Sequence, residues 1–365
     1  MSIDLIISAI KAFLVLGLLL TNTLLLIWLE RKVVAGMQAR VGPDRAGPFG
    51  IFQTVADAIK LLLKEQIMPL KADRAMYLLA PIIALVPSFL IFMIIPLGPD
   101  LNLEINGQNI NVPLVGADLN VGVLFFLALS SIAVYSVVLA GWSSGSKYPL
   151  LGGVRASAQM ISYEAAMGLS LVPVILYSGS MSMTEIVKSQ AGNLSSPIPF
   201  LDAIVSFIPK WNVFPQFVAF AIFFIASVAE VNRAPFDLVE AEQELVGGFH
   251  TEYSGFRFAM FFLAEYINMF NMCAITATFF LGGWLGPTFS NILPPLISAF
   301  MPAFWLGVKT FGLLFIYVWI RATLPRLRYD QLMELGWKRL IPISLVWLIL
   351  TSIVLGLREF GFPWS

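Results

Sequence analysis

The sequence predicts an all-α membrane protein with about eight transmembrane helices and an amphipathic surface helix in the first cytoplasmic connection. Of its 365 residues, 58% are hydrophobic and 12% are charged, whereas soluble domains carry about 25% charged residues. The mean hydropathy is +0.85. Apolar runs of the length that crosses a bilayer, about 17 to 25 residues, recur along the chain. Soluble globular and disordered classes are therefore excluded.

Eight apolar runs are long enough to span a bilayer. Because lipid offers no partner for backbone polar groups, these runs are predicted to be helices rather than open strands. The first run is too long for the core of a signal peptide and follows no basic stretch, so we interpret it as a span. The predicted spans are residues 5–29, 76–97, 119–142, 156–177, 213–231, 256–281, 303–322 and 341–357.

The distribution of basic residues predicts the orientation. Connections that follow odd-numbered spans hold 17 of the 22 Lys and Arg residues. Because basic connections stay in the cytoplasm, these connections are predicted to be cytoplasmic and both termini external. The chain is then a single polytopic domain, 1–365, with notable cytoplasmic connections at 30–75 and 230–255.

The first cytoplasmic connection contains a rigid turn followed by an amphipathic helix. Two Gly-Pro pairs lie between Arg40 and Gly50, a composition typical of a fixed turn. The helix has a basic polar face and is predicted to lie along the membrane surface. It either anchors the chain on anionic lipid or forms one wall of an opening from the bilayer plane. Its apolar stripe consists of Phe52, Val55, Ala56, Ile59, Leu62 and Leu63.

A compact acidic block interrupts the basic cytoplasmic side. Residues 230–252 carry one firm cation, Arg233, among six acids. One interpretation is a solvated loop that docks a basic partner. The acids also continue into the membrane, which favours a different role. The acids of the block are Glu230, Asp237, Glu240, Glu242, Glu244 and Glu252.

Two further carboxylates lie inside predicted spans. Glu164 and Glu265 are placed about 12–14 Å below the cytoplasmic edge by the helical rise. A charged residue at such depth costs about 2.5–3.5 kcal/mol, so it should face the protein interior or water. Crowded carboxylates that resist desolvation can take up and release protons, which is what a proton relay needs. Alternatively, a buried carboxylate such as Glu230 pairs with Arg233.

The chain has one cysteine and one histidine, Cys273 and His250. Haem pairs and iron–sulfur clusters need more ligands of these types than the chain has. Any redox centre involved is therefore predicted to be held by another chain, and no metal site is expected. Cys273 is assigned to core packing, and no role is assigned to His250.

Several segments resemble the H-type membrane subunit of proton-pumping NADH:quinone oxidoreductase, respiratory complex I. The most specific is Arg233-Ala234-Pro235-Phe236-Asp237-Leu238, followed by the acidic run that ends in Val246-Gly247-Gly248. The resemblance covers nearly the whole chain in order. The other matching segments are 30–32, 40–50, 56–65, 141–148, 162–164, 251–254, 282–284, 321–323 and 328–331.

The resemblance implies a subunit that is not catalytic alone and holds no redox centre. It would line a chamber through which quinone, ubiquinone or menaquinone, leaves the bilayer. FMN and iron–sulfur clusters would lie in partner subunits. The resemblance also implies two groups of site residues and a supporting ion pair of Arg233. The entrance would be framed by Arg31, Arg40, Arg45, Asp57, Lys60 and Glu65, and the proton path by Glu164, Glu230, Asp237, Glu240, Glu242, Glu244 and Glu265.

The partners implied are hydrophilic quinone-site and terminal-cluster subunits, small membrane-arm subunits and the lipid bilayer, with no nucleic acid. The location implied is a bacterial inner membrane. Two alternatives stay open: an autonomous proton-coupled secondary transporter, and the equivalent subunit of a ferredoxin-, deazaflavin- or hydrogenase-linked complex. No matched pair of broken spans is visible, which counts against the transporter.

Overall fold

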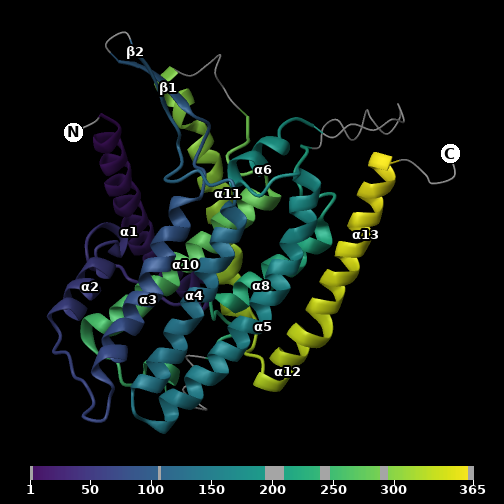
Figure 1. The fold of residues 1–365 in the computed structure, drawn as a ribbon. Coiled ribbons are helices and arrows are strands. Elements are labelled where there is room, and N and C mark those ends of the chain that lie inside the picture. Colours follow the sequence, from purple (N-terminus) through teal and green to yellow (C-terminus); the bar gives the residue numbers. More distant parts are fainter. Residues whose placement is uncertain (1–2, 106–107, 194–208, 239–246, 288–294, 361–365) are drawn as a thin grey trace.

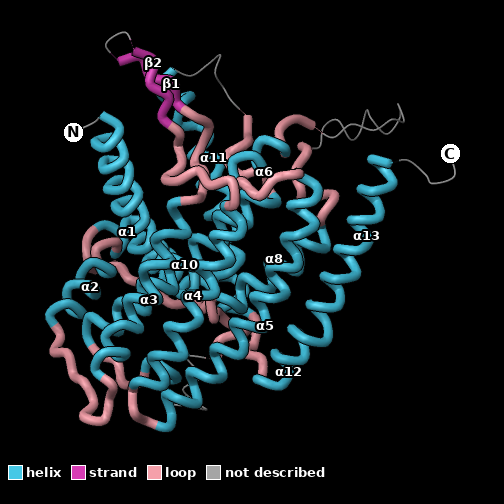
Figure 2. The backbone as a smooth tube through the Cα atoms, viewed as in Figure 1, coloured by secondary structure: helices cyan, strands magenta, loops and turns pink. Residues whose placement is uncertain are grey.

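The computed structural model describes residues 3–105, 108–193, 209–238, 247–287 and 295–360. Within these ranges the chain is mainly helical (Figure 2), as predicted. The principal helices are α1 (Ile3–Met37), α2 (Gln53–Leu63), α3 (Arg74–Met93), α4 (Gly122–Ser143), α5 (Lys147–Ser178), α6 (Met183–Ser189), α8 (Phe217–Glu230), α10 (Gly255–Phe280), α11 (Pro295–Thr323), α12 (Tyr329–Glu334) and α13 (Ile341–Phe360). Three short helical segments are η1 (Pro48–Gly50), η2 (Gly248–His250) and η3 (Leu335–Leu340).

The predicted spans correspond one by one to helices. In the described part of the chain, seven helices are long and apolar enough to cross a membrane. The predicted fifth span is α8, which is apolar but has only 14 residues. The chain is therefore a multi-pass membrane protein with about eight spans.

The helices lie side by side in one bundle (Figure 1). The start of α1 and the end of α13 lie at the same end of this bundle, whereas α2 and α12 lie toward the other end. This arrangement is what an even number of spans produces. The connection after α3, predicted as a loop, contains a hairpin of β1 (Leu101–Ile105) and β2 (Gln108–Val112) at the first of these ends.

Small residues allow close approaches within the bundle. A Cβ added at Gly152 of α5 would lie 2.7 Å from the Cα of Gly248 in η2. A Cβ at Gly141 of α4 would lie 2.6 Å from the carbonyl oxygen of Pro149. Such contacts are how membrane helices gain packing energy where lipid supplies no hydrophobic drive. The first of these approaches places η2 directly against α5, and the second places α4 against α5.

Helix α1 continues past the predicted end of the first span, Leu29, to Met37. Glu30 and Arg31 therefore lie in the helix rather than in the connection. Both charges are tolerated there because each has a partner from another element: Arg321 contacts Glu30, and Asp57 of α2 contacts Arg31 with 2.6 Å between Nη1 and Oδ2.

The polar side of α2 faces α1, and its apolar side faces away from the protein. Leu62 and Leu63 are 57% and 82% exposed, and Phe52 and Ile59 are also exposed. The predicted amphipathic helix is therefore present. Its uncovered apolar stripe is the arrangement expected of a helix that lies on a membrane surface.

Candidate functional site

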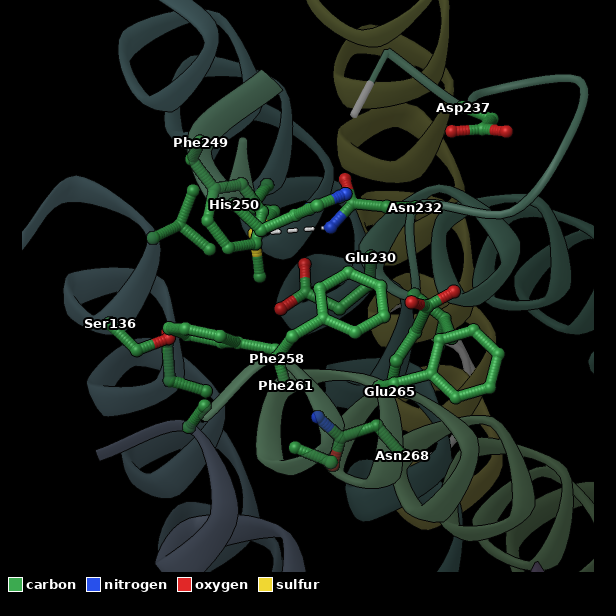
Figure 3. A pocket seen from close by; sticks show the side chains of 17 residues that line it. Ser136, Glu230, Asn232, Asp237, Phe249, His250, Phe258, Phe261, Glu265 and Asn268 are labelled. Atoms are coloured by element: carbon green, nitrogen blue, oxygen red, sulfur yellow. Dashed lines mark hydrogen bonds between the residues drawn. The ribbon is translucent and has the colours of Figure 1, made fainter. Parts of the chain in front are cut away.

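A pocket lies among α10, η2 and the turn after α8, and we call it the inner pocket. Helix α10 lines it with Phe258, Phe261, Phe262, Glu265 and Asn268, whose spacing of three and four residues places them on one helix face. Glu230, the last residue of α8, also lines it. The turn after α8, residues 231–238, adds Asn232 and Asp237, and η2 adds Phe249 and His250. Figure 3 shows the carboxyl groups of Glu230 and Glu265 within the pocket and that of Asp237 at some distance from them.

Glu230 and Glu164 form a pair of carboxyl groups held by hydroxyls. Glu230 is buried, and its Oε1 accepts a hydrogen bond from the Oγ of Ser130 at 2.8 Å. Glu164 on α5 accepts a hydrogen bond from the adjacent Ser131. The two serines are consecutive on α4, so one helix turn joins both acids. Among the described residues, neither carboxyl group has an Arg or Lys within ion-pair distance.

A second set of charges alternates in sign from α11 to α10. Arg321 at the end of α11 contacts Glu30 of α1. Arg233 lies 3.5 Å from Glu30 (Nη1 to Oε1) and 3.0 Å from Glu265 (Nε to Oε1). Its guanidinium carbon also lies 4.4 Å from the ring centre of Tyr266. Arg233 is thus paired with Glu30 and Glu265 rather than with Glu230.

Arg233 is only 4% exposed, yet it keeps its charge. Burial by itself lowers the pKa of the guanidinium, but the Glu265 and Glu30 carboxylates beside it raise the pKa above its ordinary value. A fixed positive charge therefore stands between the two carboxylates. The alternating chain of Arg321, Glu30, Arg233 and Glu265 is neutral as a whole.

A second hollow, which we call the entrance cavity, lies where α1, α10 and α11 meet. Arg31, Gln38 and Arg40 line it from α1 and the turn that follows. Glu30, Tyr266 and Arg321 close its inner side. Phe262 lines both this cavity and the inner pocket. Since Glu30 lines one hollow and Glu265 the other, Arg233 lies between them.

The structure brings some predicted entrance residues together and leaves others apart. Arg31 and Arg40 line the entrance cavity, and Asp57 holds Arg31. Arg45, Lys60 and Glu65 are exposed and line neither hollow.

The predicted proton-path residues are also divided. Glu230 is buried, whereas Glu164 and Glu265 are partly buried. Asp237 lines the inner pocket but contacts Arg326, with 3.2 Å between its Oδ2 and Nη2. Glu240, Glu242 and Glu244 lie outside the described residues.

His250 is held between aromatic rings. Its ring centre lies 5.1 Å from that of Phe249 and 5.3 Å from that of Phe258. Burial lowers the pKa of His250 to about 4, against a smaller opposite effect of Asp237. The imidazole is therefore neutral at pH 7 and serves as part of the pocket wall.

Three residues of the site were not predicted as site residues. Glu30 and Arg321 belong to segments that the resemblance matched, but their pairing joins positions 291 residues apart. Gln159 on α5 is fully buried and bonds to the turn after α8. A polar residue within a long apolar run was the available signal for Gln159, but sequence spacing does not reveal its partners.

Comparison with known proteins agrees with this architecture. The profile that describes the NADH dehydrogenase family matches residues 10–352. A protein of Koribacter versatilis (strain Ellin345), named as the H-type subunit, number 2, of NADH-quinone oxidoreductase, is 46% identical over 366 aligned residues, which cover 97% of this chain and 98% of that protein. The chain therefore belongs to the NADH dehydrogenase family, and over nearly its whole length it is similar to the H-type subunit of NADH-quinone oxidoreductase.

Proposed function

We propose that this chain is the membrane subunit that admits quinone from the bilayer and links quinone reduction to proton translocation in a respiratory NADH:quinone oxidoreductase. The observation that carries the proposal is the pair of hollows on either side of Arg233. One is lined by arginines beside the membrane-surface helix α2, and the other is lined by buried acids. Family membership supplies the class of reaction in which this pair has a use.

The entrance cavity suits a molecule with a polar head and an apolar tail. Arg31 and Arg40 offer N–H donors to carbonyl oxygens of a quinone head. Val34 and Phe262 supply apolar contact, and the exposed apolar stripe of α2 would keep this part of the chain at the membrane surface. A quinone can thus leave the bilayer without exposing its tail to water.

The inner pocket suits proton uptake. Reduction of a quinone to a quinol consumes two electrons and two protons, so charge changes near the chamber act on nearby carboxyl groups. Glu230 and Glu164 are held by the serine pair on α4, so a proton added to either carboxyl group leaves no arginine unpaired. Glu265 transmits the charge state of the pocket to Arg233 at 3.0 Å.

In this proposal, the redox centres and the other subunits of the complex are supplied by other chains. Iron–sulfur clusters lie in partner subunits, because this chain has a single cysteine. The family likeness assigns FMN to partner subunits as well. Hydrophilic quinone-site and terminal-cluster subunits cover the basic cytoplasmic side, and small membrane-arm subunits flank the bundle. The membrane is a bacterial inner membrane, with both termini on the external side.

The test is Glu230→Gln in the intact complex. The amide keeps the size of the side chain and can still accept the hydrogen bond of Ser130, so assembly should be preserved. The number of protons moved per electron should fall, while NADH oxidation by a water-soluble acceptor that bypasses quinone stays normal. The matched control is Glu185→Gln on α6, an exposed glutamate paired with Lys188.

If Glu230→Gln changes neither the proton-to-electron ratio nor the rate of quinone reduction, the proton-path role of Glu230 is wrong. Purification of the chain as an active monomer that moves a solute into liposomes contradicts the whole proposal and favours the transporter.

A further inference from the structure

Gln159 joins helix α5 to both ends of the turn that follows α8. Its Nε2 lies 2.8 Å from the carbonyl oxygen of Ala229 and 2.7 Å from that of Phe236. It also lies 3.3 Å from Oδ1 of Asn232 in the middle of the turn. The Gln159 side chain is fully buried. One amide group therefore contacts the start, the middle and the end of the turn.

The end of α8 and the turn that follows it carry two opposite charges that point in different directions. Glu230 is directed to Ser130 and the inner pocket, whereas Arg233, three positions later, is directed to Glu30 and Glu265. The backbone bonds within the turn are all local: the N–H of Asn232 donates to Ala229 O at 3.2 Å, that of Arg233 to Val228 O at 3.3 Å, that of Phe236 to Arg233 O at 2.9 Å and that of Leu238 to Phe236 O at 3.2 Å. None of these four bonds ties the turn to another helix. Asn232 has a φ of 53°, a left-handed conformation that non-glycine residues adopt only when their surroundings require it.

We propose that Gln159 is the positioning residue of the proton path, holding the turn so that Glu230 is directed to Ser130 in the inner pocket while Arg233 is directed to Glu30 and Glu265. This inference rests on the proposed function above. Gln159 touches neither hollow and is not a catalytic residue. It acts through the backbone carbonyls of Ala229 and Phe236.

The choice of side chain follows from the acceptors. Two buried carbonyl oxygens need two donors, and a carboxamide supplies two N–H groups without a charge. Lysine or arginine would supply donors but would place a further cation beside Arg233 in a buried region. A side chain without donors would leave each carbonyl with backbone donors alone, among them Asn232 N for Ala229 O and Leu238 N for Phe236 O, both at 3.2 Å.

Two substitutions separate the role of the donors from that of the volume. Gln159→Met keeps the length of the side chain and removes both donors. Gln159→Glu keeps the shape and supplies at most one donor, so its effects should be intermediate. The matched control is Gln190→Met. Gln190 is equally buried and donates to Thr278 O at 2.9 Å, but it joins α6 to α10 on a different side of the bundle.

Two measurements on the intact complex decide the matter: amide hydrogen exchange of the peptide 228–238, and the proton-to-electron ratio over a range of pH. Gln159→Met should speed exchange of this peptide roughly tenfold, the factor that about one lost buried hydrogen bond produces. The proton-to-electron ratio should fall and its pH profile should shift. Gln190→Met should change neither, whatever it does to overall stability.

If amide exchange of the peptide 228–238 is unchanged in Gln159→Met, the positioning role is wrong. If Gln159→Met does not assemble, unchanged exchange of that peptide in Gln159→Glu leads to the same conclusion. Faster exchange with a normal ratio and pH profile also overturns it, provided that Glu230→Gln impairs pumping. If Glu230→Gln has no effect either, the proposed function fails instead, so the two failures can be told apart.

Discussion

Gly152→Ala should displace the wall of the inner pocket that η2 forms. The added Cβ would lie 2.7 Å from the Cα, and 2.8 Å from the carbonyl carbon, of Gly248, and 3.0 Å from the nitrogen of Phe249. All three atoms belong to the backbone, so no side-chain rotation relieves the contact. Either α5 or η2 must move, and η2 carries Phe249 and His250 into the pocket.

The expected magnitude comes from two opposing effects. Overpacking a well-packed interior costs about 1–3 kcal/mol, whereas replacing glycine by alanine inside a helix stabilises it by about 0.5–1 kcal/mol. The net change for Gly152→Ala is therefore a destabilisation of up to about 2.5 kcal/mol. Gly168→Ala on the same helix is the matched control, because its Cβ would meet only Leu127 Cδ1 at 3.9 Å. That variant should show only the stabilising effect.

The assay is thermal inactivation of quinone reduction in the purified complex, together with the initial rate before heating. Gly152→Ala should be inactivated at a lower temperature than the unmodified complex, and Gly168→Ala at the same or a higher temperature. Equal inactivation temperatures and equal initial rates in the two variants would refute the close approach of α5 and η2.

Three further predictions concern individual side chains. Because burial lowers the pKa of His250 to about 4, His250→Gln should leave the pH profile of quinone reduction unchanged between about pH 6 and 8, and a shifted profile would show that His250 titrates there. Between about pH 6.5 and pH 4, His250 takes up a proton in the unfolded chain but not in the folded one, so the free energy of unfolding falls as the pH falls. His250→Gln should therefore lose less stability than the unmodified protein over this range. Arg31→Gln breaks an exposed pair with Asp57, so the free energy of unfolding should change by no more than about 1 kcal/mol. The KM for quinone should rise, and an unchanged KM would contradict a role of Arg31 at the proposed entrance. Ser131→Ala removes the hydroxyl that donates to Glu164 and should lower the proton-to-electron ratio. The control Ser170→Ala on α5, which loses a bond to the Met167 carbonyl, should leave that ratio unchanged.

Most of the fold could be predicted because lipid makes hydropathy a direct readout of helical spans. The amphipathic helix was also predictable, since its apolar stripe follows the helical period. The true end of α1 was not. A local reading ends the first span at the first charged residue, Glu30, but that charge is neutralised by Arg321 and Arg233 from distant parts of the chain. Long-range pairing of this kind leaves no local signal.

The sequence indicated which acids belong to the candidate site but not which residues they pair with. Intramembrane acids can be found in the sequence because charges are rare in apolar spans. Glu230 is buried in the structure, and Glu164 and Glu265 are partly buried. Proximity in sequence suggested that Arg233 pairs with Glu230, yet the turn after α8 directs the two side chains apart. The direction of a side chain after a helix end depends on the turn, and that turn is held by Gln159, seventy residues or more away from its acceptors.

The buried carboxylates fall into two electrostatic groups, and the division bears on which of them carry protons. Glu30 lies beside the guanidinium groups of Arg233 and Arg321, and Glu265 lies beside that of Arg233. Protonating either would remove one of the two carboxylates that pair with the buried Arg233, which is costly in a region of low dielectric. Within the described part of the chain, Glu230 and Glu164 are bonded to serine hydroxyls rather than paired with Arg or Lys. A hydroxyl can donate to a carboxylate and accept from a carboxylic acid by rotation alone, so these two residues can change protonation without breaking an ion pair. The arginine-bound acids are then suited to sensing and transmitting charge, and the serine-bound acids to carrying protons.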